Sequence, residues 1–194
     1  MKPEINRFKD YIRSIVTMDD DNFDMCSPYL KVSTIEKGDY LVKEGKICRH
    51  IAYIDSGLFR VFHLKNGTEV NSCFCTGNSI TSSFDSFLNE SESQESIQAM
   101  EHSVLVTLSK GNLQRLYAQS LPWQAVGRLM TEKECLRLSN RASSLTFETA
   151  IEKYKKILEH QPDLLQRVSV QHIASYIGVS RETLSRIRKK VSEE

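Results

Sequence analysis

A run of charged side chains near the C-terminus has the chemistry to contact a nucleic acid. Residues 180–190 include five basic side chains and one acidic side chain. Arginine can donate two parallel hydrogen bonds to guanine O6 and N7, and glutamate can accept one from cytosine N4. Because a helix turns about 100° per residue, Arg181, Glu182 and Arg186 would share one side of a helix, opposite an apolar side. The pattern predicts a helix that packs by one face and offers hydrogen bonds by the other.

The twenty residues 170–189 have the spacing of a helix-turn-helix. Gly178 stands where the turn needs positive φ, Ala174 is small where the two helices must cross closely, and Ser180 can cap the second helix. A generic amphipathic helix explains an apolar face equally well, but not this combination of small, capping and donor-rich positions. Apolar residues fill the wedge between the two helices. The predicted packing residues are Ile173, Ala174, Ile177, Gly178, Leu184 and Ile187.

The second helix of such a motif fits the major groove of DNA with its N-terminal residues at base edges. Lys189 lies later in the helix, so we expect it to contribute mainly charge. Residues 1–127 carry 13 basic and 16 acidic side chains, whereas residues 128–194 carry 13 basic and 9 acidic side chains. This asymmetry is typical of a protein with a polyanion-binding end. The predicted DNA-binding residues are Ser180, Arg181, Glu182, Ser185, Arg186 and Lys189.

The elements that must position this motif begin with short helices, expected within residues 4–30, and a β-rich region. Five of the eight glycines fall at positions 38, 45, 57, 67 and 77, and regular turn signals between short apolar runs indicate an antiparallel barrel or sandwich. Asn66-Gly67 predicts a type I′ hairpin, because both turn residues need positive φ. The polar segment 76–95 is expected to be an inserted loop or short helix. The predicted strands are 40–42, 50–54, 58–64, 69–74, 97–99 and 104–108.

A long helix separates this region from the C-terminal motif. Pro122 suits the first turn of a helix, and we expect the helix to run to about Ala142 and to dimerise, although Lys133 and Asn140 interrupt its heptad pattern. A shorter helix is expected near 147–158. The predicted interface residues are Trp123, Val126, Leu129, Met130 and Leu136. The predicted domains are a β-roll at 1–120, a linking and dimerising helix at 121–145 and a helix-turn-helix unit at 146–194.

The segment Ser180-Arg181-Glu182-Thr183-Leu184-Ser185-Arg186, after a glycine turn, resembles the recognition helix of the Crp–Fnr superfamily of regulators. The order of roll, long helix and helix-turn-helix matches that family over nearly the whole chain. The resemblance implies an α+β fold with an antiparallel, jelly-roll, cyclic-nucleotide-binding-like roll and flanking helices. It further implies a long dimerisation helix and a C-terminal helix-turn-helix domain of winged-helix type.

What the resemblance implies about function is a roll that senses a signal and two recognition helices that read a palindrome. The resemblance implies that Arg181, Glu182 and Arg186 read bases, and that Ser185 helps to discriminate between half-sites. The partners that it implies are double-stranded DNA, a second copy of the chain and RNA polymerase.

The roll departs from the cyclic-nucleotide-binding members of this family. Their phosphate cassette reads approximately Gly-Glu-Leu, a short helix, and then Arg-Ser or Arg-Thr before a strand that ends in alanine. Here Asn78 follows Gly77, and Ser93-Gln94 stands in place of the arginine pair. The loss of an arginine–phosphate pair removes the main charge-assisted bond of such a site, so we expect no binding of cyclic AMP and predict no cofactor. The oxygen-sensing members use a cluster of N-terminal cysteines, and Cys26 is the only cysteine in the first 47 residues.

Two other function classes are compatible with a β-roll. A metal-dependent enzyme of the cupin type needs converging ligands, usually with a His-x-His pair. The five histidines, at 50, 63, 102, 160 and 172, never fall two apart. We therefore predict no enzyme, no catalytic residue and no metal ligand. The other alternative is a signalling module that binds a cyclic nucleotide or another small ligand and whose DNA binding is vestigial.

The composition is that of an ordinary globular protein, with 40% hydrophobic and 26% charged residues. No run approaches the roughly 20 apolar residues of a membrane span, and the first residues lack a signal-peptide pattern, so we expect a cytoplasmic protein with no membrane partner. Five irregularly spaced cysteines fit a reducing compartment. Cys73 and Cys75 fall on one face of a predicted strand, and without matching ligands elsewhere we interpret them as two small, partly buried apolar residues.

Overall fold

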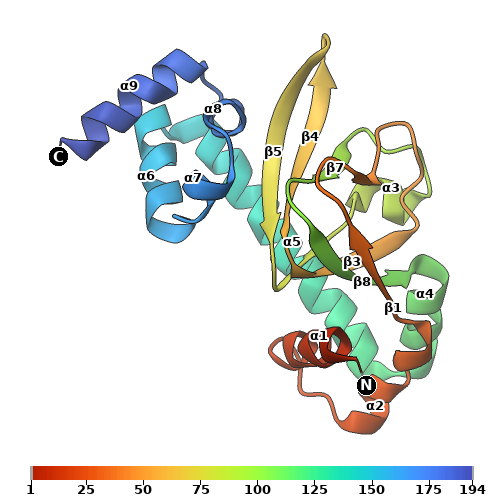
Figure 1. Cartoon of the computed structure of the whole chain (residues 1–194). Coiled ribbons are helices and arrows are strands. Elements are labelled where there is room, and N and C mark those ends of the chain that lie inside the picture. Colours follow the sequence, from red (N-terminus) through yellow and green to blue (C-terminus); the bar gives the residue numbers. More distant parts are fainter. Residues whose placement is uncertain (1, 194) are drawn as a thin grey trace.

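The computed structural model describes residues 2–193, and its elements form a β-roll with helices around it, one long helix and a C-terminal helical unit (Figure 1). Residues 1 and 194, the outer ends of the predicted domain ranges, lie outside the described residues. The elements before the first strand are α1 (Pro3–Arg13), α2 (Asp20–Asp24) and the 3₁₀ turn η1 (Ser27–Tyr29). The side chains of α1 that face the roll are apolar or aromatic, and they are Ile5, Phe8, Tyr11 and Ile12.

The roll consists of two four-stranded antiparallel sheets, in the orders β1-β8-β3-β6 and β2-β7-β4-β5. This confirms the predicted antiparallel roll. The eight strands are β1 (Lys31–Ile35), β2 (Tyr40–Val42), β3 (His50–Ser56), β4 (Leu58–Lys65), β5 (Thr68–Thr76), β6 (Ser79–Thr81), β7 (Ser96–Ala99) and β8 (Ser103–Ser109). Two sheet-edge strands, β1 and β6, were not predicted, because their short, half-polar sequences lack the apolar alternation of a buried strand. The segment 76–95 holds β6 and the short helix α3 (Phe84–Asn89).

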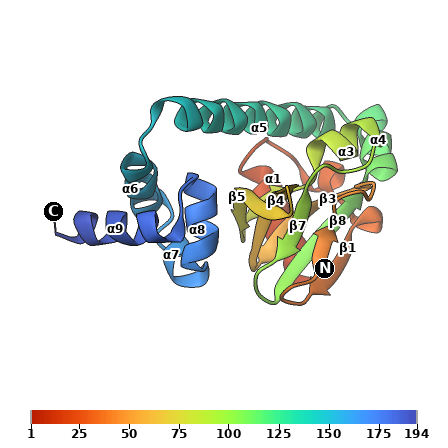
Figure 2. The same cartoon turned by 90° about the horizontal axis from the view of Figure 1, so that it is seen from above.

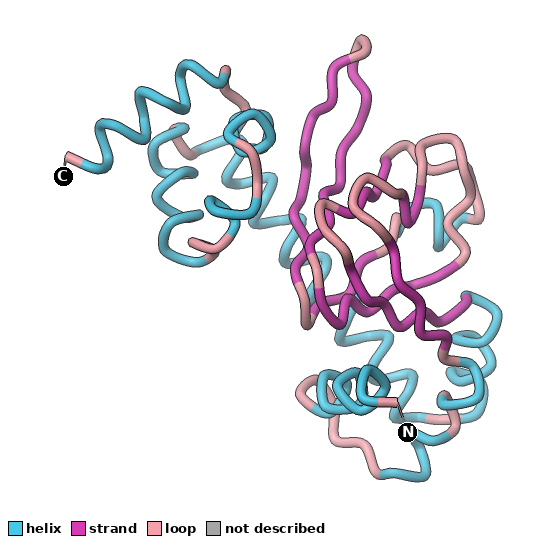
Figure 3. Tube along the Cα trace, viewed as in Figure 1, coloured by secondary structure: helices cyan, strands magenta, loops and turns pink. Residues whose placement is uncertain are grey.

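The turn between β4 and β5 has the predicted conformation, with φ of 51° at Asn66 and 76° at Gly67. These strands form the long hairpin that extends beyond the rest of the roll (Figure 3). Their register shifts once, since Val61 pairs with Cys73 but Phe62 pairs with Asn71. Ser72 therefore has no counterpart in β4, and this bulge reverses the alternation of side chains before and after it.

Gly57 makes the tight connection between β3 and β4. Its φ is 114°, and a Cβ atom there would lie 2.0 Å from the side-chain oxygen of Ser103 and 2.9 Å from the Ser103 Cα. Only glycine combines this left-handed conformation with so close an approach of β8.

After the roll the chain is helical: α4 (Lys110–Gln119), α5 (Leu121–Phe147), α6 (Ala150–His160), α7 (Leu164–Arg167), α8 (Val170–Ile177) and α9 (Arg181–Ser192). Ser120 caps α5, Pro122 lies in its first turn, and the helix continues past Ala142 to Phe147. The next helix begins at Ala150 rather than near 147, because Thr149 and Glu152 form a capping box. Residues 110–193 contain no strand (Figure 3), so the expected winged-helix type is wrong for this part of the chain.

The N-terminal half of α5 is packed into the core of the roll and its flanking helices. Trp123 is 1% exposed, its Nε1 donates to the backbone oxygen of Asn22 at 2.9 Å, and its ring lies 6.5 Å from that of Phe23. Val126 is also 1% exposed, and Met130 is half-buried against the same core. The prediction that Trp123 and Val126 face a second copy was wrong, because the core of the roll and its flanking helices already buries them, whereas Met130 keeps part of its surface exposed. Within residues 2–193, no helix combines the length and the hydrophobicity that crossing a membrane requires.

Candidate nucleic-acid interface and sensor roll

Helices α8 and α9 are joined by a turn whose hydrogen bonds fix their crossing. Ser169 caps α8 by accepting from the N–H of His172. At the other end Gly178 has a φ of 88°, and the N–H groups of Gly178 and Val179 both donate to the backbone oxygen of Ala174, at 2.9 and 3.0 Å. Such a left-handed glycine ends a helix and turns the chain sharply. The Ser180 hydroxyl then accepts from the N–H of Thr183 at 3.2 Å and begins α9.

The apolar sides of these two helices form a second core with α6, α7 and two side chains of the roll. The predicted packing residues lie there, with Ala174 and Leu184 each 1% exposed and Gly178 at the exposed turn. Tyr154, Ile157 and Leu164 complete this C-terminal core from α6 and α7. The buried members of the predicted set are Ile173, Ala174, Ile177, Leu184 and Ile187.

The opposite side of α9 is free, and the predicted DNA-binding residues lie along it. Both views place α9 on the outer side of the C-terminal unit, with α8 between α9 and the roll (Figures 1 and 2). Hydrogen bonds from the Glu182 backbone N–H and then the Ser180 hydroxyl lower the pKa of the Glu182 carboxyl, so it is an ionised acceptor at neutral pH. The Ser185 hydroxyl donates to the Arg181 backbone oxygen at 3.0 Å. The exposed residues are Ser180, Arg181, Glu182, Ser185, Arg186 and Lys189.

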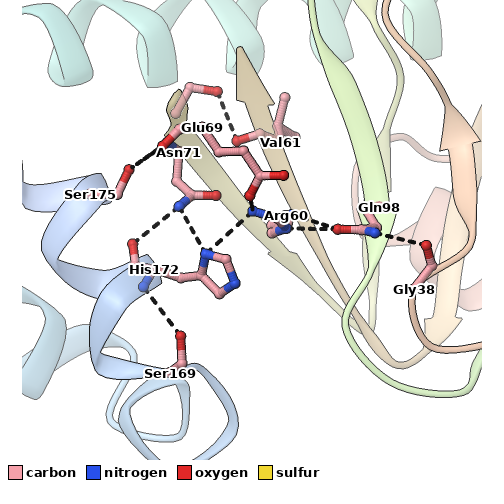
Figure 4. Close-up of polar contacts among 10 residues, drawn as sticks. Gly38, Arg60, Val61, Glu69, Asn71, Gln98, Ser169, His172 and Ser175 are labelled. Carbon is pink, nitrogen blue, oxygen red and sulfur yellow. Dashed lines mark hydrogen bonds and ion pairs between the residues drawn. The ribbon is translucent and has the colours of Figure 1, made fainter. Parts of the chain in front are cut away.

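Helix α8 is docked on strand β5 by a network of polar side chains (Figure 4). The N–H of Asn71 donates to the Ser175 hydroxyl at 3.0 Å, and that hydroxyl donates to the Glu69 backbone oxygen at 3.1 Å. The Nδ1 atom of His172 lies 3.3 Å from Arg60 Nη1 and 3.3 Å from Asn71 Nδ2. Because a guanidinium and an amide nitrogen can only donate, His172 Nδ1 must be the acceptor and the imidazole is neutral.

Arg60 lies at the centre of this network and is only 5% exposed. It donates to Glu69 Oε2 at 2.5 Å and twice to Gln98 Oε1, at 2.9 and 2.6 Å, and Gln98 in turn donates to the Gly38 oxygen. The hydrogen bond from Arg60 lowers the pKa of the Glu69 carboxyl. Burial, and then the charge of Arg60, lower the pKa of His172. The Oδ1 atom of Asn71 is buried without a hydrogen-bond partner, which makes this network costly to desolvate and sensitive to change.

Apolar and charged contacts extend the same interface. Leu58 and Phe74 of the roll belong to the C-terminal core, and the ring of Phe74 meets the edge of Tyr176 at 5.4 Å. Arg141 of α5 stacks on Tyr176 at 4.0 Å and donates to its backbone oxygen at 2.6 Å. Arg167 pairs with Glu101 at 2.6 Å. None of these residues was predicted to take part in an interface, because their partners are far away in the chain and no local pattern links them.

The start of the cassette helix differs from the sequence-based assignment. The helix is α3, and the residues before it are Thr81, Ser82 and Ser83 rather than Gly77-Asn78. Asn78 lies in the turn before β6, with a φ of 60°. The Ser83 and Ser93 hydroxyls are 2.8 Å apart, and Ser93 donates to the Glu95 backbone oxygen. Ser83 thus lies directly before the helix, and Ser93 lies at the position where an arginine was expected.

Two thiols and an arginine lie beside Thr81 and Glu95. The sulfur atoms of Cys73 and Cys75 are 3.8 Å apart. A hydrogen bond from Cys75 lowers the pKa of the Cys73 thiol, whereas that bond and burial raise the pKa of Cys75. Arg137 of α5, held by Glu134 through two bonds of 2.8 and 2.6 Å, interacts electrostatically with both thiols. Burial also raises the pKa of the nearby Glu95 carboxyl.

Comparison with known proteins identifies the architecture. Residues 32–120 match the family described as the cyclic nucleotide-binding domain. No curated protein matches the sequence. Among solved structures, FixK2 from Bradyrhizobium japonicum has a TM-score of 0.72 at 17% identity, covering 84% of this chain and 85% of its own.

Two further structures are similar over most of their length. The c-di-GMP-responsive global regulator CLP of Xanthomonas campestris has a TM-score of 0.69 at 20% identity, covering 90% of this chain and 92% of its own. A crp/fnr-family protein from Eubacterium rectale has a TM-score of 0.67 at 15% identity, covering 90% and 84%. At these identities the likeness establishes the fold, and it agrees with the order of elements that the sequence analysis expected.

Proposed function

We propose that this chain, which has the fold of the Crp–Fnr regulators and a cyclic nucleotide-binding domain at residues 32–120, is a transcription regulator that binds DNA through α9. The observation that carries the proposal is the free side of α9. Arg181, Glu182 and Arg186 lie exposed along it, while capping and packing hold the helix rigidly against α8. A rigid helix with donors and an acceptor at its N-terminal half suits the major groove.

Base reading is assigned to Arg181, Glu182 and Arg186, with Ser185 beside them. An arginine that bonds both O6 and N7 of guanine selects against other bases, whereas a lysine near a phosphate adds affinity without selection. Lys189 lies in the last turns of α9 and is assigned to the phosphate backbone. The Ser180 hydroxyl, which caps the helix, orients the first turn toward the DNA.

We infer that the active form is a dimer assembled through the outer side of α5. This side is free of other elements, since the roll and the C-terminal unit both lie on the opposite side of the helix (Figure 2). Leu129 and Leu136 are one heptad apart on it, and Leu136 and Phe147 are 65% and 82% exposed. Exposed large apolar side chains in a row are the usual mark of a protein interface. A two-fold dimer would present two copies of α9 to a palindrome.

The effector of the roll is not cyclic AMP in this proposal. The serine hydroxyls at positions 83 and 93 cannot replace the charged partners of a cyclic phosphate and a ribose. Calorimetry with cyclic AMP should therefore give no heat of binding at micromolar concentrations.

The DNA proposal is tested by alanine substitution at matched arginines. We expect Arg186→Ala to weaken binding to a selected duplex by about 1–3 kcal/mol, or roughly 5–150-fold, and to relax the preference at one base pair. Arg115→Ala removes an equally exposed arginine from α4 and should leave affinity unchanged. Lys189→Ala should make the salt dependence shallower for every sequence alike. Equal affinities of the Arg186 and Arg115 variants would contradict the assignment of α9 to the groove.

A further inference from the structure

The thiols of Cys73 and Cys75 form a pair on the inner side of an edge strand. They alternate with Phe74, so both point to the same side of β5, and the bulge at Ser72 turns Asn71 to the other side, toward α8. From α5, Arg137 and Arg141 interact electrostatically with Cys73. The two residues are half-buried as a whole, and their sulfur atoms are largely desolvated.

This geometry suits a bridging ion better than a disulfide. Residues two apart in a strand have Cα atoms about 6.7 Å apart, near the upper limit of about 6.8 Å for a disulfide, whose Cβ atoms must approach to about 3.8 Å. A metal with bonds of about 2.3 Å to sulfur can bridge two sulfurs up to about 4.6 Å apart. The present separation of 3.8 Å lies below that reach, so an ion bridging the two sulfurs in a line would spread them apart by somewhat less than about 1 Å.

The number of available ligands selects the class of ion. Among residues 2–193, no three His, Cys, Asp or Glu side chains gather in a way that would hold a metal. Zinc and iron–sulfur sites need four ligands and do not fit. Two thiolates alone suit a soft ion of low coordination number, for which sulfur is the preferred ligand.

The charges around the pair select a monovalent ion. Two thiolates and one monovalent cation carry a net charge of −1. Arg137 and Arg141 act on Cys73 as positive charges and Glu134 as a negative one, while burial raises the pKa of the neighbouring Glu95 carboxyl and favours its neutral form, so one positive charge remains to balance the complex. An ion of higher charge would leave that positive charge unbalanced in a partly desolvated place.

We propose that Cys73 and Cys75 are the two ligands of a single soft monovalent metal ion of the copper(I) and silver(I) class. Binding exchanges the two thiol protons for the ion, which forms two metal–sulfur bonds and releases two protons without oxidation or reduction. The site stands independently of DNA binding, whereas its regulatory role rests on the proposed function.

A route from this site to α9 follows from the contacts of Phe74. This residue lies between the two cysteines and packs against Tyr176 of α8, which Arg141 holds from the other side. Tyr176 is also coupled electrostatically to both thiols. An ion that spreads the two sulfurs therefore moves Phe74, which lies between them, and the strand surface on which α8 is docked.

Silver(I) is the probe for the site, and the full-length Cys135→Ser variant is the reference because Cys135 is the exposed free thiol. We expect the reference to take up one silver ion per chain by native mass spectrometry. Cys73→Ser and Cys75→Ser are made in the Cys135→Ser reference. Each should weaken the affinity for silver by more than about 100-fold, because losing a residue that only supports a metal ligand already costs about 10–100-fold. Cys73→Ala and Cys75→Ala, with circular dichroism as a check of folding, repeat the test without a hydroxyl.

Uptake that is unchanged in the Cys73 or Cys75 variants would overturn the site, as would no uptake by the reference. If peroxide instead closed a disulfide between these cysteines in a chain that takes up no silver, the pair would be a redox site and the proposal wrong. Because silver uptake is measured without DNA, the metal site can be tested even if the chain does not bind DNA. Silver that binds but leaves duplex affinity unchanged would refute the regulatory role alone.

Discussion

Protonation of His172 should loosen the docking of α8 on β5 when the pH falls from 7.5 to 5.5. In the docked state His172 Nδ1 accepts from Arg60 and Asn71, each at 3.3 Å, and burial and Arg60 lower its pKa. A histidine whose pKa is lower in the docked state binds more protons once released. Stability is thus complete above the ordinary histidine pKa of about 6.5 and is lost as the pH falls below it.

The loss of docking free energy can be worked out from the two hydrogen bonds that a protonated His172 Nδ1 can no longer accept. At about 0.5–1.5 kcal/mol for each bond, the loss is about 1–3 kcal/mol. Solvent screens the new charge on a half-buried ring, so we expect the lower half of this range. About 1–2 kcal/mol corresponds to about 5–30-fold for complete protonation, and proton linkage between pH 7.5 and 5.5 limits the shift in the docking equilibrium to about 5–10-fold. Glu69 stays ionised throughout this window, because the hydrogen bond from Arg60 lowers its pKa.

Hydrogen exchange at the Asn71 amide is the assay, because this N–H donates to Ser175 of α8 and reports docking directly. Its protection factor, corrected for the intrinsic pH dependence, should fall by about 5–10-fold. His172→Gln keeps an acceptor that does not titrate and should abolish the fall. His50→Gln is the control. It removes another histidine whose pKa is lowered by burial but which does not contact α8, and the fall in the Asn71 protection factor should remain. A fall that survives His172→Gln would refute the reasoning.

Two further substitutions test the assembly and the roll. Leu136→Glu should raise the dimer dissociation constant by at least about 100-fold in light scattering, since each copy loses a buried leucine worth about 1.5 kcal/mol or more. Leu138→Glu, at an equally exposed position on another side of α5, should leave the dimer intact, and equal effects would contradict the interface. Gly57→Ala should lower the melting temperature by about 5–20 °C through strain and overlap with Ser103. In Gly111→Ala the new Cβ atom lies in open space, so the melting temperature should change little. Similar decreases in melting temperature for both variants would contradict the role given to Gly57.

Local patterns account for what could be predicted from the sequence. The φ of Gly178 and the burial of Ala174 follow from the needs of a tight turn and a close helix crossing, which depend on neighbouring residues only. The Asn66-Gly67 turn is local in the same sense. Periodicity also identified the apolar residues of α5, but it could not tell which element covers them. Trp123 packs against α2, some 100 residues earlier in the chain, and not against a second copy.

The docking network and the thiol pair needed the structure. Arg60 and His172 are 112 residues apart, and neither belongs to a motif. The bulge at Ser72 decides that Asn71 faces α8 while Cys73 faces the interior, and regular alternation predicts the same side for both. The cassette was misplaced at Asn78 because the sequence does not reveal where β6 ends and α3 begins.

Duplexes that the purified chain selects from a random pool reveal whether α9 reads a DNA sequence. We expect enrichment of an inverted repeat that contains G·C pairs, with half-sites centred about 10–10.5 base pairs apart, as two copies of α9 on one face of DNA require. The Arg186→Ala chain should enrich a repeat with relaxed preference at one position of each half-site. A pool with no enriched sequence, or the same motif from both chains, would contradict DNA reading by α9.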